Sequence, residues 1–343
     1  MKTSSFSFEL PEHLIAQYPS AERDKSRLFV LDRQSDVYRH AAVLQLADFL
    51  EPGTVVVRNN SRVRKARIYA RREDTKGEVE FLFLRQADPC TWHAITSKTK
   101  RQHPGSRYLF PGNITGMITG EHHDDGCTVK TIQLDQAVGE AYFTSYGHMP
   151  LPPYIRREDG ELDEARYQTA YAKIPGSAAA PTAGLHFTNE VEVSLLDKSI
   201  EIVEVTLHVG LGTFLPIRSD DIEDHRIHSE TCTLGEDEAD KLNRAKHAGR
   251  KIAAVGTTSM RTLETMWNGR EFLPGTKDTS LYITPGYDFG AVDILFTNFH
   301  TPKSSLLVLV AAFAGYERTM AAYKEAVRLS YRFYSYGDAM LIL

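Results

Sequence analysis

Hydrophobic and polar positions follow three different patterns along the chain, and the first covers residues 1–61. It contains a helix-like segment at 11–19, a strand at 26–33, a helical stretch at 43–53 and a strand at 53–60. Pro52 and Gly53 mark the turn from helix to strand, because both residues commonly end a helix. This alternation of helical and extended segments predicts the start of an α/β domain.

The second pattern covers residues 62–147, where short runs of alternating polar and apolar residues follow one another closely. Turn-forming residues separate these runs, which lie at 66–72, 78–85, 91–98, 106–110, 114–121, 127–134 and 140–147. Many short strands with turns between them are typical of an antiparallel barrel or sandwich. We therefore predict an inserted antiparallel β-barrel domain over residues 62–147.

Helices and strands alternate again from residue 148 to the end of the sequence. We expect helices at 189–199, 236–249, 259–269, 304–315 and 317–331, and strands at 200–210, 250–257, 280–286 and 292–299. Such alternation is typical of a largely parallel sheet with covering helices. Residues 1–61 and 148–343 are thus expected to form one discontinuous α/β catalytic domain.

Composition narrows the function classes. A length of 343 residues fits about two domains, and the formal net charge of −5 means that any nucleic-acid binding must come from a local patch. The first residues lack the apolar core of a signal peptide, and the apolar run at 306–315 is too short for a bilayer. Cys90, Cys127 and Cys232 are scattered, which argues for a reduced, cytoplasmic protein without structural zinc.

A basic patch of this kind lies in the predicted barrel. Residues 58–72 and 91–107 carry many arginines and lysines and no acid. Like charges repel one another, so phosphate is a natural partner, and nearby aromatic rings favour RNA or a single strand. The alternative is a solvated strand face with acids opposite it. The candidate nucleic-acid-binding residues are Arg62, Arg64, Arg67, Lys98, Lys100 and Arg101.

Two segments, 178–187 and 205–214, each place one histidine beside Gly, Ala and Thr residues. Small residues let the backbone approach a ligand closely, and histidine can move a proton near neutral pH. We expect His186 and His208 to face one pocket, with walls at Thr182, Gly184, Gly210 and Gly212. The alternative is a pair of Gly-rich turns with ordinary hydrogen-bonded histidines.

The segment 255–264 predicts a strand that ends at Gly256 and a helix that begins with hydroxyl side chains. A helix N-terminus attracts anions, so Thr257 and Thr258 are candidates for binding a carboxylate, although they equally suit simple capping. Arg261 and Glu264 would lie one turn apart on that helix and are further candidates for binding the same substrate.

The remaining signals are weaker. Asp338 follows a glycine in the tyrosine-rich tail and is a candidate pocket residue. His225 and His228 have only a loose metal-ligand spacing, so we expect no metal site. The sequence has neither a GxSxG elbow nor a phosphate-binding loop, and Leu215 breaks the dinucleotide pattern that begins at Gly210.

Several long strings of the sequence together resemble one family, the S-adenosylmethionine:tRNA ribosyltransferase-isomerases of queuosine biosynthesis. The resemblance runs from residue 8 to 342 and is carried by strings such as SRLFVLDR, HMPLPPYI, RYQTAYAKIPGSAAAPTAGLHFT, TLHVGLGTF, AVGTTSMRTLE, TNFHTPKSSLLVLVAAFAG and YRFYSYGDAML. It implies an α/β domain with an inserted barrel.

The resemblance also implies a reaction. Enzymes of this kind transfer and isomerise the ribosyl group of S-adenosylmethionine onto 7-aminomethyl-7-deazaguanine at the tRNA wobble position, giving epoxyqueuosine-tRNA, adenine and methionine. The sulfonium acidifies the neighbouring C5′ hydrogens, so His186 or His208 suits the role of base, with Asp338 as a further catalytic candidate. We expect no cofactor, no membrane association and a monomer.

The chain departs from the family pattern at several places. It has Asn60, Lys65, Leu215, Thr284 and Gly290 where the family pattern has Asp, Pro, Arg, Tyr and Lys. Asn60 cannot replace an aspartate that acts as a base. The gain and loss of positive charges at the other positions is expected to shift the surface that contacts tRNA. An RNA-binding module without catalysis and a serine-type hydrolase are the alternative functions.

Overall fold

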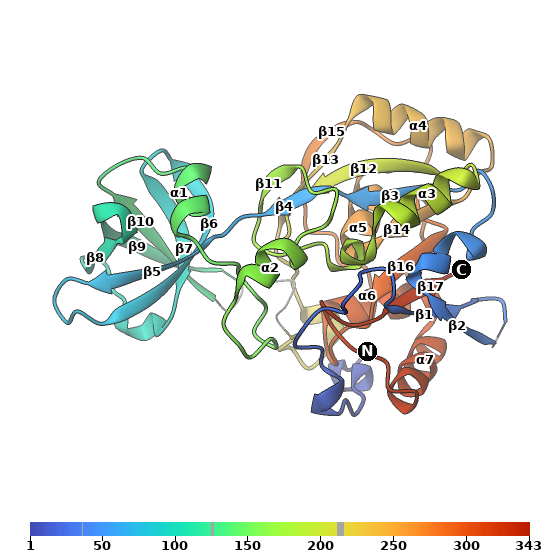
Figure 1. The fold of residues 1–343 in the computed structure, drawn as a ribbon, viewed down its shortest axis with the longest axis horizontal. Helices are drawn as coiled ribbons and strands as arrows, with labels where there is room; N and C mark the ends of the chain where they lie inside the picture. The colour runs from blue at the N-terminus through green and yellow to red at the C-terminus, as the bar shows by residue number, and fades with distance from the viewer. Residues whose placement is uncertain (36, 125–126, 211–215) are drawn as a thin grey trace. The chain divides into compact units, whose positions relative to one another are not determined.

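The computed structural model describes residues 1–35, 37–124, 127–210 and 216–343. These residues form two compact units (Figure 1). The first contains residues 1–62, 152–157 and 166–343, and the second contains residues 63–151 and 158–165. The segment 158–165 thus packs with the inserted residues, although its place in the sequence suggested the α/β domain.

The first unit is built on a nine-stranded mixed sheet. Its strand order is β15 (Gly275–Thr279), β13 (Glu230–Leu234), β12 (Glu201–Leu207), β3 (Val55–Asn59), β14 (Ile252–Val255), β16 (Ile294–Asn298), β17 (Ala339–Ile342), β1 (Arg27–Leu31) and β2 (Tyr38–Ala42). The run β12-β3-β14-β16 and the pair β17-β1 are parallel, whereas the remaining pairs are antiparallel. The predicted α/β class is confirmed, and its parallel strands lie at the centre.

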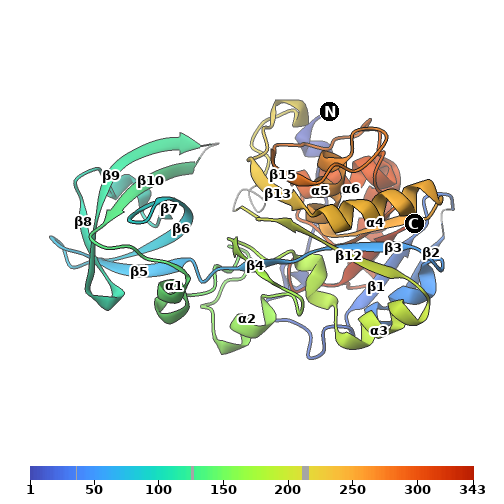
Figure 2. The same cartoon turned by 90° about the horizontal axis from the view of Figure 1, so that it is seen from above.

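Helices cover both faces of this sheet (Figure 2). One face packs against α4 (Glu236–His247), α5 (Gly256–Met266), α6 (Ser305–Ala314) and α7 (Tyr316–Arg328). The other packs against α3 (Asn189–Asp197) and the 3-10 helix η3 (Val43–Phe49). Strand residues alternate between the two cores: Val55 and Val57 enter the first, and Val56 enters the second.

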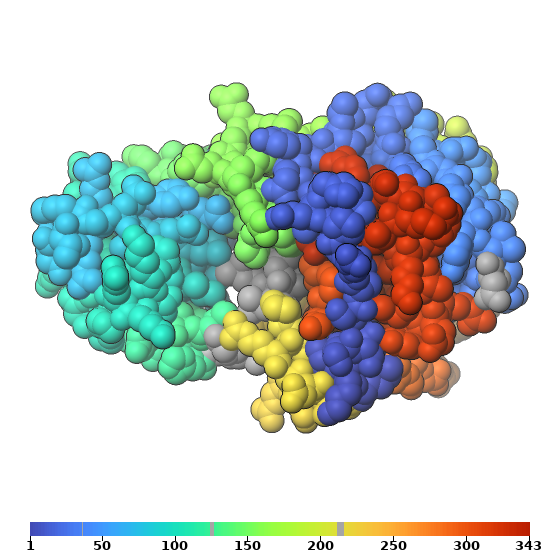
Figure 3. Space-filling view, turned by 90° about the horizontal axis from the view of Figure 1, so that it is seen from below, coloured from blue at the N-terminus to red at the C-terminus, as the bar shows by residue number. Residues whose placement is uncertain are grey.

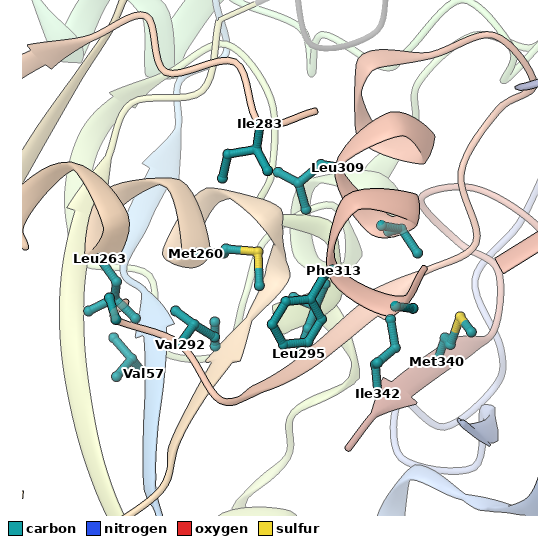
Figure 4. Close-up of a cluster of buried hydrophobic side chains, with 14 of the residues drawn as sticks. Val57, Met260, Leu263, Ile283, Val292, Leu295, Leu309, Phe313, Met340 and Ile342 are labelled. Carbon is teal, nitrogen blue, oxygen red and sulfur yellow. The ribbon is translucent and has the colours of Figure 1, made fainter. Parts of the chain in front are cut away.

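The larger core joins strands to helices that are far apart in the sequence. Figure 4 shows Val57 and Leu295 from the sheet beside Met260 and Leu263 of α5 and Phe313 of α6. All five side chains are at most 4% exposed. This packing fixes the start of α5 against the ends of the parallel strands.

The N-terminal residues lie against C-terminal segments on one face of the molecule (Figure 3). The segment begins with the 3-10 turns η1 (Thr3–Phe6) and η2 (Glu12–Leu14). The helix expected at 11–19 is wrong beyond that single turn, because Ile15 forms a bridge with Phe333 and the backbone N–H of Ala16 donates to Phe333.

The second unit contains a closed barrel of antiparallel strands, which confirms the predicted inserted barrel. Its order is β10 (Cys127–Leu134), β7 (Thr91–Thr96), β6 (Glu78–Asp88), β5 (Arg67–Arg72), β8 (Arg107–Phe110) and β9 (Ile114–Asp124). Short 3-10 turns η4 (Thr99–Arg101) and η5 (Pro111–Asn113) precede and follow β8. Phe81, Phe83 and Trp92 fill the barrel interior.

Two predicted strands are wrong. Residues 140–147 form the helix α1 (Glu140–Tyr146), since one buried aromatic, Phe143, packs its ring 5.0 Å from that of Trp92 while neighbouring side chains remain more exposed. Residues 280–286 do not extend β15, because its partner β13 already ends the ladder at the pair of Glu230 and Thr279.

The remaining elements are short. β4 (Ser61–Val63) pairs with β11 (Ile174–Ser177), and α2 (Glu161–Arg166), η6 (Thr182–His186) and η8 (Ile222–Asp224) complete the described set. Among the described residues, no single helix has both the length and the apolar character to cross a membrane. Only α6 and α7 taken together meet that test, and they are bent by 116° at their junction.

Candidate active site

Two adjoining hollows lie at the carboxyl ends of the parallel strands β14 and β16. They share Thr182, His300 and Leu306 in their walls. We call them together the strand-end cavity, whose polar lining comes from Thr182, Thr257, Thr258, Thr297, Asn298, His300, Thr301, Tyr154, Tyr334 and Ser335. Ligands of α/β sheets bind beyond this edge of the strands, so the cavity is the candidate substrate site.

Two polar atoms in the cavity walls have no partner within the described part of the chain. They are the hydroxyl oxygen Oγ1 of Thr258 and the amide oxygen Oδ1 of Asn298. Their residues are 7% and 1% exposed. Buried polar atoms are almost always hydrogen-bonded in native proteins, so an unmet donor and acceptor in a cavity indicate a place for a ligand.

Two buried, neutral histidines lie close to this site: His300 lines the strand-end cavity, and His186 lines a neighbouring hollow that shares Ser335 with it. His186 lies at the end of η6, and its Nε2 is 3.2 Å from the Nδ2 of Asn298. His300 lines the cavity itself, with its Nε2 2.9 Å from the Oγ1 of Thr297. Burial lowers the pKa of His186 to about 4 and the pKa of His300 to about 3. Both rings are therefore unprotonated at neutral pH, and their lowered pKa values make them weaker bases than an exposed histidine.

His208 has a different environment. It follows β12, its backbone N–H donates to Thr231, and a Cβ atom added to Gly176 would lie 2.9 Å from its ring. The hollows bordered by His186 and His300 do not include His208 in their walls. The structure thus does not bring His186 and His208 together in these hollows, because β11 and not a cavity faces the second ring.

The start of α5 forms one wall of the cavity. Gly256 has a φ of +86°, a value that favours glycine, and it turns the chain from β14 directly into the helix. Thr257 and Thr258 follow and line the cavity. The N-cap residue is Val255, which has no capping side chain, so these hydroxyls are not used as caps.

Arg261 and Glu264 lie further along α5 and bind protein groups. Arg261 forms a buried ion pair with Glu230, and its Nε donates to the carbonyl of Leu281 at 3.1 Å. The carboxylate of Glu264 accepts the backbone N–H groups of Ala291 and Val292, both at 3.1 Å, and burial raises its pKa. These contacts favour structural roles for two residues that the sequence suggested as ligands of S-adenosylmethionine.

The glycines of the two histidine segments serve close packing. A Cβ atom on Gly184 would lie 2.0 Å from the hydroxyl oxygen of Tyr171. The backbone N–H of Gly210 donates to the Oε1 of Glu230 at 2.7 Å. Gly212 and Leu215 lie outside the described residues. Thr182 alone of this predicted set lines the strand-end cavity.

Asp338 is placed as an anchor for the backbone. Its two carboxylate oxygens accept the N–H groups of Arg27 at 3.0 Å and Arg332 at 2.8 Å. The residue is 4% exposed, and burial raises its pKa. The sequence-based suggestion of a catalytic role is not supported by this geometry, because both oxygens hold the turn before β17.

The basic residues of the barrel divide into two groups. Arg64 pairs with Glu140, and Arg67 pairs with Glu80 at 3.1 Å. Lys98, Lys100 and Arg101 are exposed at the turn after β7 and form no ion pair with any described residue. Arg62 is exposed as well, in the first unit. The unpaired cations are the better candidates for phosphate contacts.

The departures from the family pattern are accommodated locally. Asn60 donates to Glu204 at 3.2 Å and accepts from Thr206 at 2.7 Å, and Lys65 pairs with Glu164 at 2.6 Å. Gly290 lies against the indole of Trp267, so that a Cβ there would be 2.5 Å from its Nε1. Thr284 accepts a backbone hydrogen bond from Tyr287 in a loop.

Sequence reasoning missed Asn298 and His300 as cavity residues. Both residues lie between the strand expected at 292–299 and the helix expected at 304–315. Asn298 is the last residue of the buried strand β16 and His300 follows it, so their place at the carboxyl end of a parallel strand was the available signal, although no spacing motif includes either residue. Within the described residues, no group of three or more His, Cys, Asp or Glu side chains is arranged to hold a metal ion.

The structure defines an α/β protein with an inserted antiparallel barrel and a candidate ligand site at the strand ends of its sheet. The sequence profile described as "Queuosine biosynthesis protein" matches residues 3–342. The chain belongs to this family of enzymes.

Individual relatives agree with this assignment. The S-adenosylmethionine:tRNA ribosyltransferase-isomerase of Treponema denticola is 47% identical over 348 residues, and that of Clostridioides difficile is 44% identical over 345, each covering 100% of both chains. Among solved structures, the S-adenosylmethionine tRNA ribosyltransferase of Thermotoga maritima is similar, with a TM-score of 0.56 and 33% identity over 99% of this chain and 100% of that one.

Proposed function

We propose that this enzyme transfers and isomerises the ribosyl group of S-adenosylmethionine onto 7-aminomethyl-7-deazaguanine at the tRNA wobble position. The products would be epoxyqueuosine-tRNA, adenine and methionine, and we propose that the reaction takes place in the cytoplasm. The observation that carries the proposal is the match of residues 3–342 to the queuosine biosynthesis family, together with relatives of this name at 44–47% identity.

The strand-end cavity supports the proposal through the polar groups that it leaves without partners. The Oδ1 of Asn298 can accept a hydrogen bond from a ribose hydroxyl or the adenine amino group, and the hydroxyl of Thr258 can donate to a second acceptor. The N-terminus of α5 offers a favourable position for the methionine carboxylate, because unpaired backbone N–H groups and the helix dipole stabilise an anion.

His186 is the base that this geometry favours. The sulfonium of S-adenosylmethionine acidifies the C5′ hydrogens, so a weak base in a dry site can remove one of them. The buried ring of His186 is neutral at pH 7 and is held in place by Asn298. Because the positive sulfur is already a good leaving group, we propose that no cofactor takes part and that S-adenosylmethionine is consumed as a substrate.

The exposed cations of the barrel give the tRNA its contacts in this proposal. Lys98, Lys100 and Arg101 stand together on one turn and are not neutralised by carboxylates among the described residues. Such cations bind phosphates and release counterions, so binding should weaken as salt increases. We propose that the enzyme acts as a monomer.

The test is adenine release from S-adenosylmethionine in the presence of precursor tRNA. We expect release only with tRNA that carries the 7-aminomethyl-7-deazaguanine base, and no release with the same tRNA bearing guanine. Tight tRNA binding without adenine release would instead identify an RNA-binding module that has lost catalysis. Ester cleavage blocked by a serine-directed phosphonate would identify a hydrolase.

The role of His186 is tested by His186→Ala. We expect adenine release to fall by about 100-fold or more, because general-base catalysis contributes about 10²–10⁴, while tRNA affinity is retained. His247→Ala is the matched control, since His247 is exposed on α4. Equal turnover of the two variants would remove His186 from the mechanism.

A further inference from the structure

A second hollow lies beside His186, and its walls carry two guanidinium groups. Arg23 and Arg166 line it, together with the serines Ser20, Ser26 and Ser335. We call it the arginine cavity. Ser335 also lines the strand-end cavity, so the two hollows share a wall next to His186.

The charge of Arg166 is not neutralised by any carboxylate in the described part of the chain. Its Nη1 and Nη2 donate to the backbone carbonyls of Ala21 at 3.1 Å and Ser20 at 2.8 Å. Its Nε is buried and has no hydrogen-bond partner within the described residues. Carbonyl oxygens position the guanidinium but leave a full positive charge at the wall of the cavity.

Arg23 adds a second positive charge at the same place. Its Nη1 donates to the carbonyl of Leu185 at 2.9 Å, directly before His186. Burial, and next the charge of Arg166, lower the pKa of Arg23, so the two guanidiniums are close enough to repel each other. A pair of cations that is held together by backbone contacts stabilises an anion placed between them.

We propose that Arg23 and Arg166 bind a backbone phosphate of the substrate tRNA at the open side of the arginine cavity, next to the nucleotide that is modified. Paired guanidiniums with serine hydroxyls suit an oxyanion with several acceptor oxygens. The methionine end of S-adenosylmethionine carries its own ammonium beside the carboxylate, so it needs no second cation, whereas a phosphodiester has no internal counter-charge. This inference rests on the proposed function, because it assigns the site to the same tRNA.

The position of the arginine cavity suits a phosphate contact that orients the nucleotide to be modified. A phosphate held by Arg23 and Arg166 would fix the nucleotide beside the wall that both hollows share, at Ser335. Fixing a reactant in the right geometry lowers the entropic part of the barrier. Arg166 is therefore assigned as a tRNA-positioning residue.

The test is Arg166→Gln, with tRNA affinity measured at several salt concentrations. We expect the Kd for tRNA to rise about 10-fold. The slope of log Kd against log salt should decrease by the amount that corresponds to about one phosphate contact. The affinity for S-adenosylmethionine alone, measured by calorimetry without tRNA, should not change. Arg270→Gln is the matched control, because Arg270 is exposed and lines neither the arginine cavity nor the strand-end cavity.

Two results would overturn the inference. An unchanged salt slope in Arg166→Gln would place no phosphate at this residue, and a loss of S-adenosylmethionine affinity alone would assign the cavity to the carboxylate. If Arg166→Gln does not fold, the wild-type enzyme can be tested with tRNAs that carry one neutral methylphosphonate beside the wobble nucleotide. We expect one such linkage to weaken binding about 10-fold, and equal binding of all of them would refute the contact.

A result that refutes the phosphate contact can be distinguished from a result that refutes the proposed function. The phosphate contact is judged from binding alone, whereas the proposed reaction is judged from adenine release by the wild-type enzyme. An enzyme that releases adenine but has no phosphate at Arg166 would retain the first proposal and lose the second.

Discussion

The unpartnered hydroxyl of Thr258 makes an unusual prediction, because its removal should stabilise the free protein and weaken substrate binding. The Oγ1 of Thr258 is buried in the wall of the strand-end cavity without a hydrogen bond from any described residue. Thr258→Val keeps the shape of the side chain and removes the polar atom. This variant distinguishes a hydroxyl group that binds a ligand from a hydroxyl group that stabilises the fold.

The magnitude follows from the cost of a buried unpaired polar group. Leaving a hydroxyl unsatisfied costs about 1–3 kcal/mol, so Thr258→Val should raise the free energy of unfolding by about 1 kcal/mol or more. A lost hydrogen bond to the substrate costs about 0.5–1.5 kcal/mol, which corresponds to a rise in the KM for S-adenosylmethionine of about 2-fold to 10-fold.

Thr262 offers a matched control one turn later on α5. Its Oγ1 donates to the backbone carbonyl of Thr258 at 3.0 Å, and the residue is fully buried away from the cavity walls. Thr262→Val should therefore lower stability by about 0.5–1.5 kcal/mol and leave the KM unchanged.

Both variants can be measured by calorimetric unfolding of the free protein and by adenine release at saturating tRNA. The reasoning is refuted if Thr258→Val lowers stability as Thr262→Val does, or if both variants have the wild-type KM. Either result would mean that the hydroxyl of Thr258 is not reserved for a ligand.

Two further predictions concern protons and salt. Burial lowers the folded-state pKa of His186 to about 4 and that of His300 to about 3, so the unfolded chain binds more protons than the folded protein below about pH 6.5. Stability should therefore be unaffected above that pH and should fall below it by up to about 1.4 kcal/mol per pH unit for each histidine. A His300→Gln variant whose acid melting curve matches that of the wild type would contradict this expectation. Joint replacement of the exposed barrel cations Lys98, Lys100 and Arg101 should reduce the salt dependence of tRNA binding by the equivalent of about two or three phosphate contacts. The control Arg64→Gln removes a cation that is already paired with Glu140, so it should change the salt dependence less. The opposite order in a filter-binding titration would place the RNA elsewhere.

The periodic pattern of apolar residues was sufficient to predict the main elements. The short continuous apolar runs within 53–60 and 250–257 identified β3 and β14, and the long amphipathic pattern at 236–249 identified α4. Local sequence was misleading where tertiary contacts decide the structure. The helix α1 forms because Phe143 packs onto Trp92, and this partner lies far away in the sequence.

The candidate site was predicted in part. Thr182, Thr257 and Thr258 line the strand-end cavity, as strand ends and helix starts suggested, and His186 lines the neighbouring arginine cavity. The roles of charged residues were not predictable, because they depend on partners from distant segments: Arg261 meets Glu230, and Asp338 meets the backbone of Arg27. Asn298 was missed because an asparagine at a strand end has no distinctive spacing.

A structure of the enzyme with a stable sulfonium analogue of S-adenosylmethionine tests the central claim most directly. We expect the analogue to bind at the strand-end cavity, with polar atoms within hydrogen-bonding distance of the Oδ1 of Asn298 and the Oγ1 of Thr258. An analogue bound elsewhere, with both atoms still unpartnered, would contradict this claim.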